Sequence, residues 1–62
     1  AAIVSSGLEA EALLLLGEVY LQMHKWEDAR DSFTMLLRVY SESPLTVQAK
    51  SYLAFLERRA RG

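Results

Sequence analysis

Residues 12–44 read ALLLLGEVYLQMHKWEDARDSFTMLLRVYSESP, with small and aromatic side chains at fixed offsets. The residues that anchor this pattern are Leu16, Gly17, Tyr20, Trp26, Ala29, Phe33 and Leu36. On either side of His24-Lys25, apolar residues recur every three or four positions, which is typical of amphipathic helices. A turn of about two or three residues between two such helices predicts an antiparallel helical hairpin.

Capping signals place the ends of the helices. The pattern predicts helices over residues 7–23, 26–41 and 44–59. Ser6 and Glu9 fit the S-x-x-E capping box in front of the first helix. His24 suits the left-handed residue that ends a helix. Ser43 can cap the third helix, with Pro44 at the first helical position, where proline is favoured.

The first predicted helix carries two apolar stripes, which indicates that it packs against two neighbours. One stripe consists of Leu8, Ala12, Leu15, Leu16 and Val19. The other consists of Ala10, Leu13, Gly17 and Tyr20. A glycine inside a helix costs about 1 kcal/mol relative to alanine. We therefore expect Gly17 to mark the close approach of another helix, covered by Tyr20, with mere tolerance of glycine as the alternative.

An internal repeat relates the first and third helices at an offset of 37 residues, with Ser6–Tyr20 aligned to Ser43–Glu57. The matched pairs are Ser6 and Ser43, Leu8 and Leu45, Ala12 and Ala49, Leu15 and Tyr52, Leu16 and Leu53, Gly17 and Ala54, and Val19 and Leu56. A period in the thirties with one helical hairpin per unit is typical of a solenoid. Because Leu13 and Tyr20 correspond to polar residues, we interpret the third helix as a cap that closes an array and covers the first two helices. The alternative is the first half of a second hairpin.

Length and composition limit the chain to one small domain. We divide it into a tail at 1–6, the hairpin at 7–43 and a third helix with a basic end at 44–62. With 62 residues and no cysteine, the core is marginal and no disulfide braces it. The net charge of −1 argues against nucleic-acid binding through charge. The longest aliphatic run, Ala12–Leu16, is far shorter than the roughly 20 residues that a membrane span requires.

The sequence contains no pattern that predicts catalysis, a metal site or a cofactor. His24 and Asp28 are spaced i, i+4, but two ligands at a turn make a poor metal site. Glu27 and Asp31 have the same spacing, and such a pair on a helix exterior is typical of a solvated face. The basic residues of 58–61 complement the helix dipole and favour solubility. We therefore expect a protein that is not an enzyme and has no catalytic residue.

The anchoring residues resemble the tetratricopeptide repeat (TPR) family. The first helix of that family's unit carries a Leu-Gly and a Tyr, and the second carries an aromatic, an Ala and another aromatic. The residues that match are Leu16, Gly17, Tyr20, Trp26, Ala29 and Phe33, with Pro44 close to the family's closing proline. The chain departs from the pattern at Leu13, where Trp is common, at His24, where Gly or Asn is common, and at Leu36, where a small residue is usual. The resemblance covers about residues 7–59, and the 37-residue period is similar to a variant found in bacterial envelope TPR proteins.

The resemblance implies protein binding, because TPR arrays present the first helices of successive units on a concave surface that holds a peptide or partner helix. By position, the implied partner-binding residues are Glu11, Leu14, Glu18, Leu21, Gln22, Gln48, Ser51, Phe55 and Arg58. We therefore expect a protein–protein interaction module, or scaffold, that binds no nucleic acid and does not insert into membranes. The alternative function is structural, namely a self-assembly segment in which the stripe of the first helix that does not face the second helix, from Leu8 to Val19, pairs with a second copy. The compartment stays open between cytoplasm and bacterial periplasm.

Overall fold

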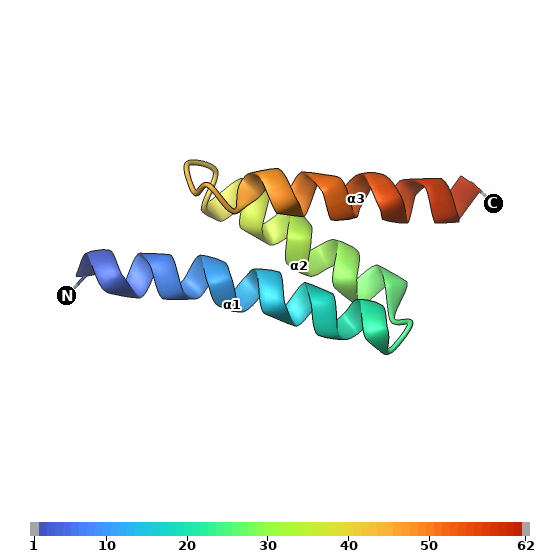
Figure 1. Ribbon diagram of the computed structural model, residues 1–62, viewed down its shortest axis with the longest axis horizontal. Helices are drawn as coiled ribbons and strands as arrows, with labels where there is room; N and C mark the ends of the chain where they lie inside the picture. The colour runs from blue at the N-terminus through green and yellow to red at the C-terminus, as the bar shows by residue number, and fades with distance from the viewer. Residues whose placement is uncertain (1, 62) are drawn as a thin grey trace.

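Three helices make up the part of the chain that the structure describes, a computed structural model giving the backbone of residues 2–61 and the side chains of residues 8–61. They are α1 (Ala2–Gln22), α2 (Trp26–Val39) and α3 (Thr46–Arg61) (Figure 1). No strand occurs in the described part. The prediction of an all-α chain, with a helical hairpin followed by a third helix, is therefore confirmed.

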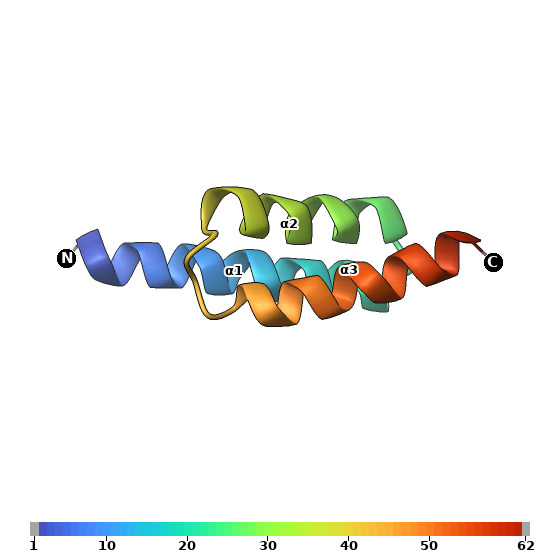
Figure 2. The same cartoon turned by 90° about the horizontal axis from the view of Figure 1, so that it is seen from above.

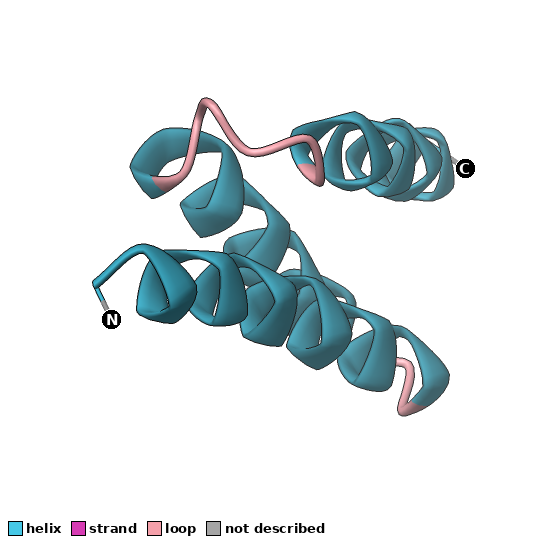
Figure 3. Cartoon of the chain, turned by 60° about the vertical axis from the view of Figure 1, so that its left-hand side comes forward, coloured by secondary structure: helices cyan, strands magenta, loops and turns pink. Residues whose placement is uncertain are grey.

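The helices form two layers. Figure 2 shows α1 and α3 in one layer and α2 lying over both of them. α2 packs extensively against each of the other two helices, and no comparable packing joins α1 to α3 in the described residues. The expectation that the third helix covers both others is therefore correct for α2 and wrong for most of α1, because α1 and α3 each pack mainly against α2 (Figure 3).

The helix bounds differ from the predicted ones at several ends. The predicted start of the first helix at residue 7 is wrong, because α1 is already helical from Ala2. The carbonyl groups of residues 2–6 accept hydrogen bonds from N–H groups one turn further along the helix. Those N–H groups would have no intrahelical partner if the helix began at residue 7. The side chain of Ser6, on which the predicted capping box depends, lies outside the described residues. α2 ends at Val39, two residues before the predicted end.

The turn between α1 and α2 has the hydrogen bonds of a Schellman motif. The Lys25 N–H donates to the Tyr20 carbonyl at 2.9 Å, and the His24 N–H donates to the Leu21 carbonyl at 3.0 Å. His24 has a φ of 62°, so the prediction of a left-handed residue here is confirmed. These two bonds satisfy carbonyls at the end of α1 and turn the chain back into α2.

The connection from α2 to α3 is organised by Ser43. Its hydroxyl accepts the Leu45 N–H at 3.1 Å, and its carbonyl accepts the Thr46 hydroxyl at 2.8 Å. α3 begins at Thr46, so the predicted start at Pro44 is wrong and the proline lies in the preceding turn. Ser43 therefore caps this turn, and α3 ends at Arg61, two residues later than predicted.

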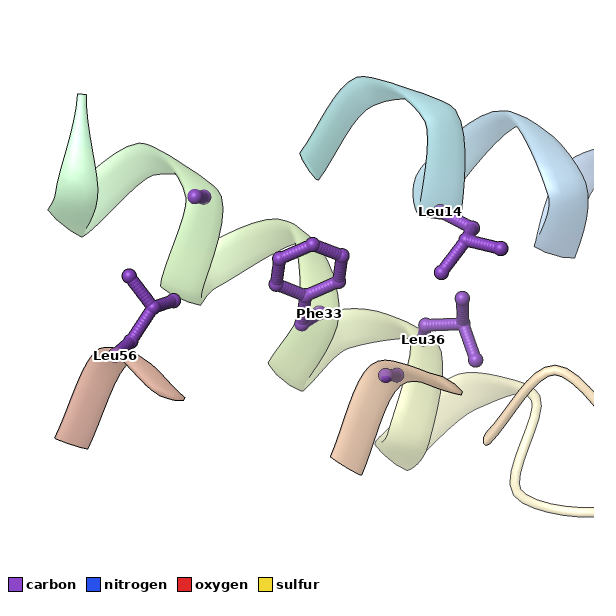
Figure 4. Close-up of a cluster of buried hydrophobic side chains, with 6 residues drawn as sticks. Leu14, Phe33, Leu36 and Leu56 are labelled. Carbon is purple, nitrogen blue, oxygen red and sulfur yellow. The ribbon is translucent and has the colours of Figure 1, made fainter. Parts of the chain in front are cut away.

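The core lies along α2, where it meets both other helices. The buried cluster consists of Leu14, Ala29, Phe33, Leu36, Ala49 and Leu56. Phe33 and Leu36 of α2 are completely buried. Leu14 approaches them from α1 and Leu56 from α3 (Figure 4). Fully burying a side chain of this size contributes roughly 1.5–3 kcal/mol to the stability of the fold. The largest completely buried side chains, Phe33 and Leu36, both belong to α2.

The two stripes of α1 have different surroundings. A β-carbon on Gly17 would lie 2.5 Å from the ring of Phe33, so the predicted close approach at this glycine is confirmed. Tyr20 packs against the same core. The other stripe, here called the open stripe, is exposed to solvent and consists of Leu8, Ala12, Leu15, Leu16 and Val19. Within the described residues α2 covers one face of α1 and no helix lies on the other, so the second of the two predicted neighbours stays a prediction.

Candidate functional site

A groove opens where the end of α1 and the middle of α3 diverge on either side of α2. Its volume is about 520 Å³. It is lined by Leu21, Gln22, His24, Trp26, Ser51, Tyr52 and Phe55, and is here called the α1/α3 groove. Four of these side chains are rings, and no lysine, arginine, aspartate or glutamate lines it. The groove therefore offers an aromatic surface with a few polar groups rather than a charged site.

Tyr52 is held in place at this groove by two contacts. Its ring stacks on Phe33, with the centroids 4.7 Å apart and the planes inclined by 11°. Its hydroxyl donates to a carboxylate oxygen of Glu18 at 2.7 Å, which ties α3 to α1. This hydrogen bond, together with partial burial and the nearby negative charge, raises the pKa of the Tyr52 phenol above its ordinary value.

The indole of Trp26 lines the groove and makes contacts with His24 and Arg59. The His24 ring stacks on it at a centroid distance of 5.2 Å. The guanidinium carbon of Arg59 lies 4.2 Å from the indole centroid, a cation–π contact between α3 and α2. These contacts restrict the rotation of an indole that is only partly buried, so its position at the groove is fixed by its neighbours.

The structure brings together only some of the residues that the TPR resemblance implied. Leu21 and Gln22 from α1 line the groove with Ser51 and Phe55 from α3. Glu18 joins them through its bond to the Tyr52 hydroxyl.

Four other implied residues lie elsewhere. Leu14 is 6% exposed and belongs to the core, so its expected place on the binding surface is wrong. It lies on the side of α1 that faces α2, where it packs next to Leu36 (Figure 4). Glu11, Gln48 and Arg58 are exposed but do not line the groove.

Sequence reasoning missed three residues of the groove, namely His24, Trp26 and Tyr52. His24 and Trp26 were assigned to the turn and to the stripe of the second helix. Tyr52 was assigned to the packing stripe of the third helix. A half-buried aromatic side chain can pack with one face and present its edge to a groove. The rings near the hairpin turn were the feature of the sequence that could have indicated these groove residues.

A second tyrosine–carboxylate pair lies away from the groove. The Tyr40 hydroxyl donates to a carboxylate oxygen of Glu9, joining the end of α2 to the first half of α1. The hydrogen bond raises the pKa of Tyr40, with smaller contributions from desolvation and from the charge of Glu9. Both tyrosines therefore fasten α1 to a neighbouring helix through a carboxylate.

The described residues contain neither a cluster of metal ligands nor a helix that could span a membrane. No three histidine, aspartate or glutamate side chains in this part gather closely enough to hold a metal ion. None of the described helices combines the length and apolar character needed to cross a membrane. No protein-family model, curated protein or solved structure matches the chain.

Proposed function

We propose that this chain is a protein-interaction module of a TPR-like helical-repeat type, in which the α1/α3 groove binds a peptide or a partner helix. The observation that supports the proposal is the convergence of two distant segments. Leu21 and Gln22 of α1 share one groove with Ser51 and Phe55 of α3. These four residues are among those that the TPR resemblance implies as partner-binding.

The chemistry of the groove favours an apolar anchor. Phe55 is 45% exposed and stands beside the partly buried rings of Trp26 and Tyr52. Aromatic side chains in such positions supply much of the binding energy in protein interfaces. Gln22 and Ser51 can donate and accept hydrogen bonds, which a peptide backbone needs when it is desolvated. The groove therefore suits a peptide with an aromatic or aliphatic side chain and an adjacent stretch of backbone that can form hydrogen bonds.

Selection of random peptides displayed on phage tests this proposal without knowledge of the natural partner. Trp26 is the sole tryptophan of the chain and lines the groove, so its fluorescence reports occupancy directly. We expect selected peptides to carry an apolar anchor and to change this fluorescence on binding.

The matched variants are F55E and V47E, both on the exposed side of α3. We expect F55E to weaken binding of the selected peptides by roughly tenfold or more, a loss of at least about 1.4 kcal/mol. Val47 is 67% exposed and does not line the groove, so V47E should bind as the unchanged chain does. Peptides that bind F55E and the unchanged chain equally would place the binding surface elsewhere.

A further inference from the structure

The open stripe of α1 is a row of large apolar side chains in contact with solvent. Leu8, Leu15 and Val19 are 59%, 53% and 49% exposed. A helix rises about 1.5 Å per residue, so the row from Leu8 to Val19 extends for roughly 16 Å. A continuous exposed apolar row marks an interaction surface more often than scattered exposed residues do.

A second hollow lies between α2 and α3, outside the α1/α3 groove. Its volume is about 390 Å³. Its apolar lining includes Leu53, Ala54 and Ala60, and charged side chains at the hollow are Arg30, Lys50 and Glu57. It is here called the α2/α3 groove. Because the alanines have no atoms beyond the β-carbon, this groove leaves room for larger side chains from outside.

The internal repeat shows what kind of element fits the α2/α3 groove. At the offset of 37 residues, Ala54 corresponds to Gly17, the small residue of α1 against which Phe33 of α2 packs. Lys50 corresponds to Leu13, which also packs against the core formed with α2. The face of α3 at this groove is therefore the counterpart of the face of α1 on which a helix docks. In α3 this face carries a positive charge, because Lys50 stands where α1 has Leu13.

The charges of α1 and α3 are opposite. Residues 2–22 carry three glutamates, at positions 9, 11 and 18, and no basic residue. α3 carries Lys50 and three arginines against one acidic residue, Glu57. A helix that brings glutamates to the α2/α3 groove would meet Arg30 and Lys50 at its border. Complementary charge of this kind orients association and disfavours the pairing of two acidic α1 helices.

We propose that copies of this chain associate head to tail, with the open stripe of α1 of one copy docked in the α2/α3 groove of the next. The leucines of the open stripe fill the space left by Ala54 and Ala60. Glu11, one helical turn before Leu15, faces Arg30 and Lys50, whereas Glu9 and Glu18 keep their bonds to Tyr40 and Tyr52. A contact between two different surfaces leaves one of each free at the ends of the assembly. An assembly built on this contact therefore extends into an open row of copies or closes into a ring.

Analytical ultracentrifugation of the full chain, with two variants, tests the proposal. L15E places a charge in the open stripe, and A54E fills the α2/α3 groove with a carboxylate. Both positions are exposed, so both variants should keep the helical circular dichroism of the unchanged chain. We expect the unchanged chain to gain mass with concentration beyond that of a dimer, and each variant alone to be monomeric. An equimolar mixture of the two should form a one-to-one dimer, because A54E keeps its open stripe and L15E keeps its groove.

Three results would overturn the proposal. The first is an unchanged chain that stays monomeric at millimolar concentration. The second is A54E that associates as the unchanged chain does, which would indicate pairing of two α1 helices. The third is a mixture of L15E and A54E that stays monomeric. Neither Leu15 nor Ala54 lines the α1/α3 groove, so peptide binding there remains a separate measurement.

Discussion

The ring of Phe33 fills the space beside Gly17, so that a β-carbon on this glycine would lie 2.5 Å from Cε1 and Cζ of the ring. The same ring stacks on Tyr52 of α3 at a centroid distance of 4.7 Å. Phe33 is itself completely buried. One side chain of α2 therefore connects all three helices, and the α1/α3 groove depends on where it holds Tyr52.

The variant G17A tests the contact between α1 and α2. Alanine gains about 1 kcal/mol of helix propensity over glycine, but overpacking a rigid core costs typically 1–3 kcal/mol. The ring is fully buried and has little room to shift, so we expect a net loss of up to about 2 kcal/mol in the free energy of unfolding. Urea unfolding followed by circular dichroism measures it. In an F33L background, the cost of G17A should shrink or reverse, and an equal cost in both backgrounds would contradict the contact.

Neighbouring residues of α2 test the position of the core. Leu36 is 0% exposed and Met35 is 51% exposed, although they are adjacent in the sequence. We expect L36A to lose about 2–5 kcal/mol of unfolding free energy, enough to unfold much of so small a chain. M35A should change it by less than about 0.5 kcal/mol. Thermal unfolding of the two variants compares them, and similar losses would mean that the buried face of α2 has been misplaced.

The turn between α1 and α2 requires a left-handed backbone conformation at residue 24. His24 has a φ of 62°, a conformation that asparagine tolerates and that a β-branched residue strongly disfavours. We expect H24V to be less stable than H24N by about 1–2 kcal/mol, measured by urea unfolding. Both variants lose the stacking on Trp26, so this difference isolates the backbone. Equal stability of H24V and H24N would argue against a left-handed residue at the end of α1.

The tyrosine–carboxylate pairs predict how stability depends on alkaline pH. Because the folded state raises the pKa of Tyr52 and Tyr40, it holds their protons more tightly than the unfolded chain does. The stability that the two tyrosine hydroxyls contribute is fully present below the ordinary tyrosine pKa of about 10 and is lost as the pH rises above it. We expect the Y40F/Y52F double variant to lose less stability than the unchanged chain between neutral and strongly alkaline pH. Melting temperatures across this range test it, and parallel pH profiles would contradict the effect.

Much of the fold follows from the sequence because its main determinants are local. The hairpin was predictable from the interruption at His24-Lys25, and the close approach at Gly17 from the cost of a glycine inside a helix. Helix ends were less accurate, because residues 2–6 extend α1 and Pro44 lies in a turn. These ends depend on competition between local turns and helical hydrogen bonds, which capping signals describe only in part.

The candidate site was less predictable than the fold. A helical periodicity gives the direction of a residue around the axis but does not say how far a neighbouring helix covers it. Leu14 was assigned to the surface although α2 covers it, whereas the stripe from Leu8 to Val19 is apolar in pattern and yet exposed in this chain. Part of the lining of the α1/α3 groove was predicted from the sequence, including Leu21 and Phe55. The part of the groove lined by Trp26 required knowledge of how α3 packs against α2, where Arg59 contacts the indole.

Phe33 of α2 joins the three helices, because it packs against Gly17 of α1 and against Tyr52 of α3. Nuclear Overhauser effects in the folded chain measure this directly. We predict strong effects from the Phe33 ring protons to both the α-protons of Gly17 and the ring protons of Tyr52. A well-dispersed spectrum in which Phe33 shows no effect to Tyr52 would contradict the stacking of α3 on the hairpin, and with it the α1/α3 groove.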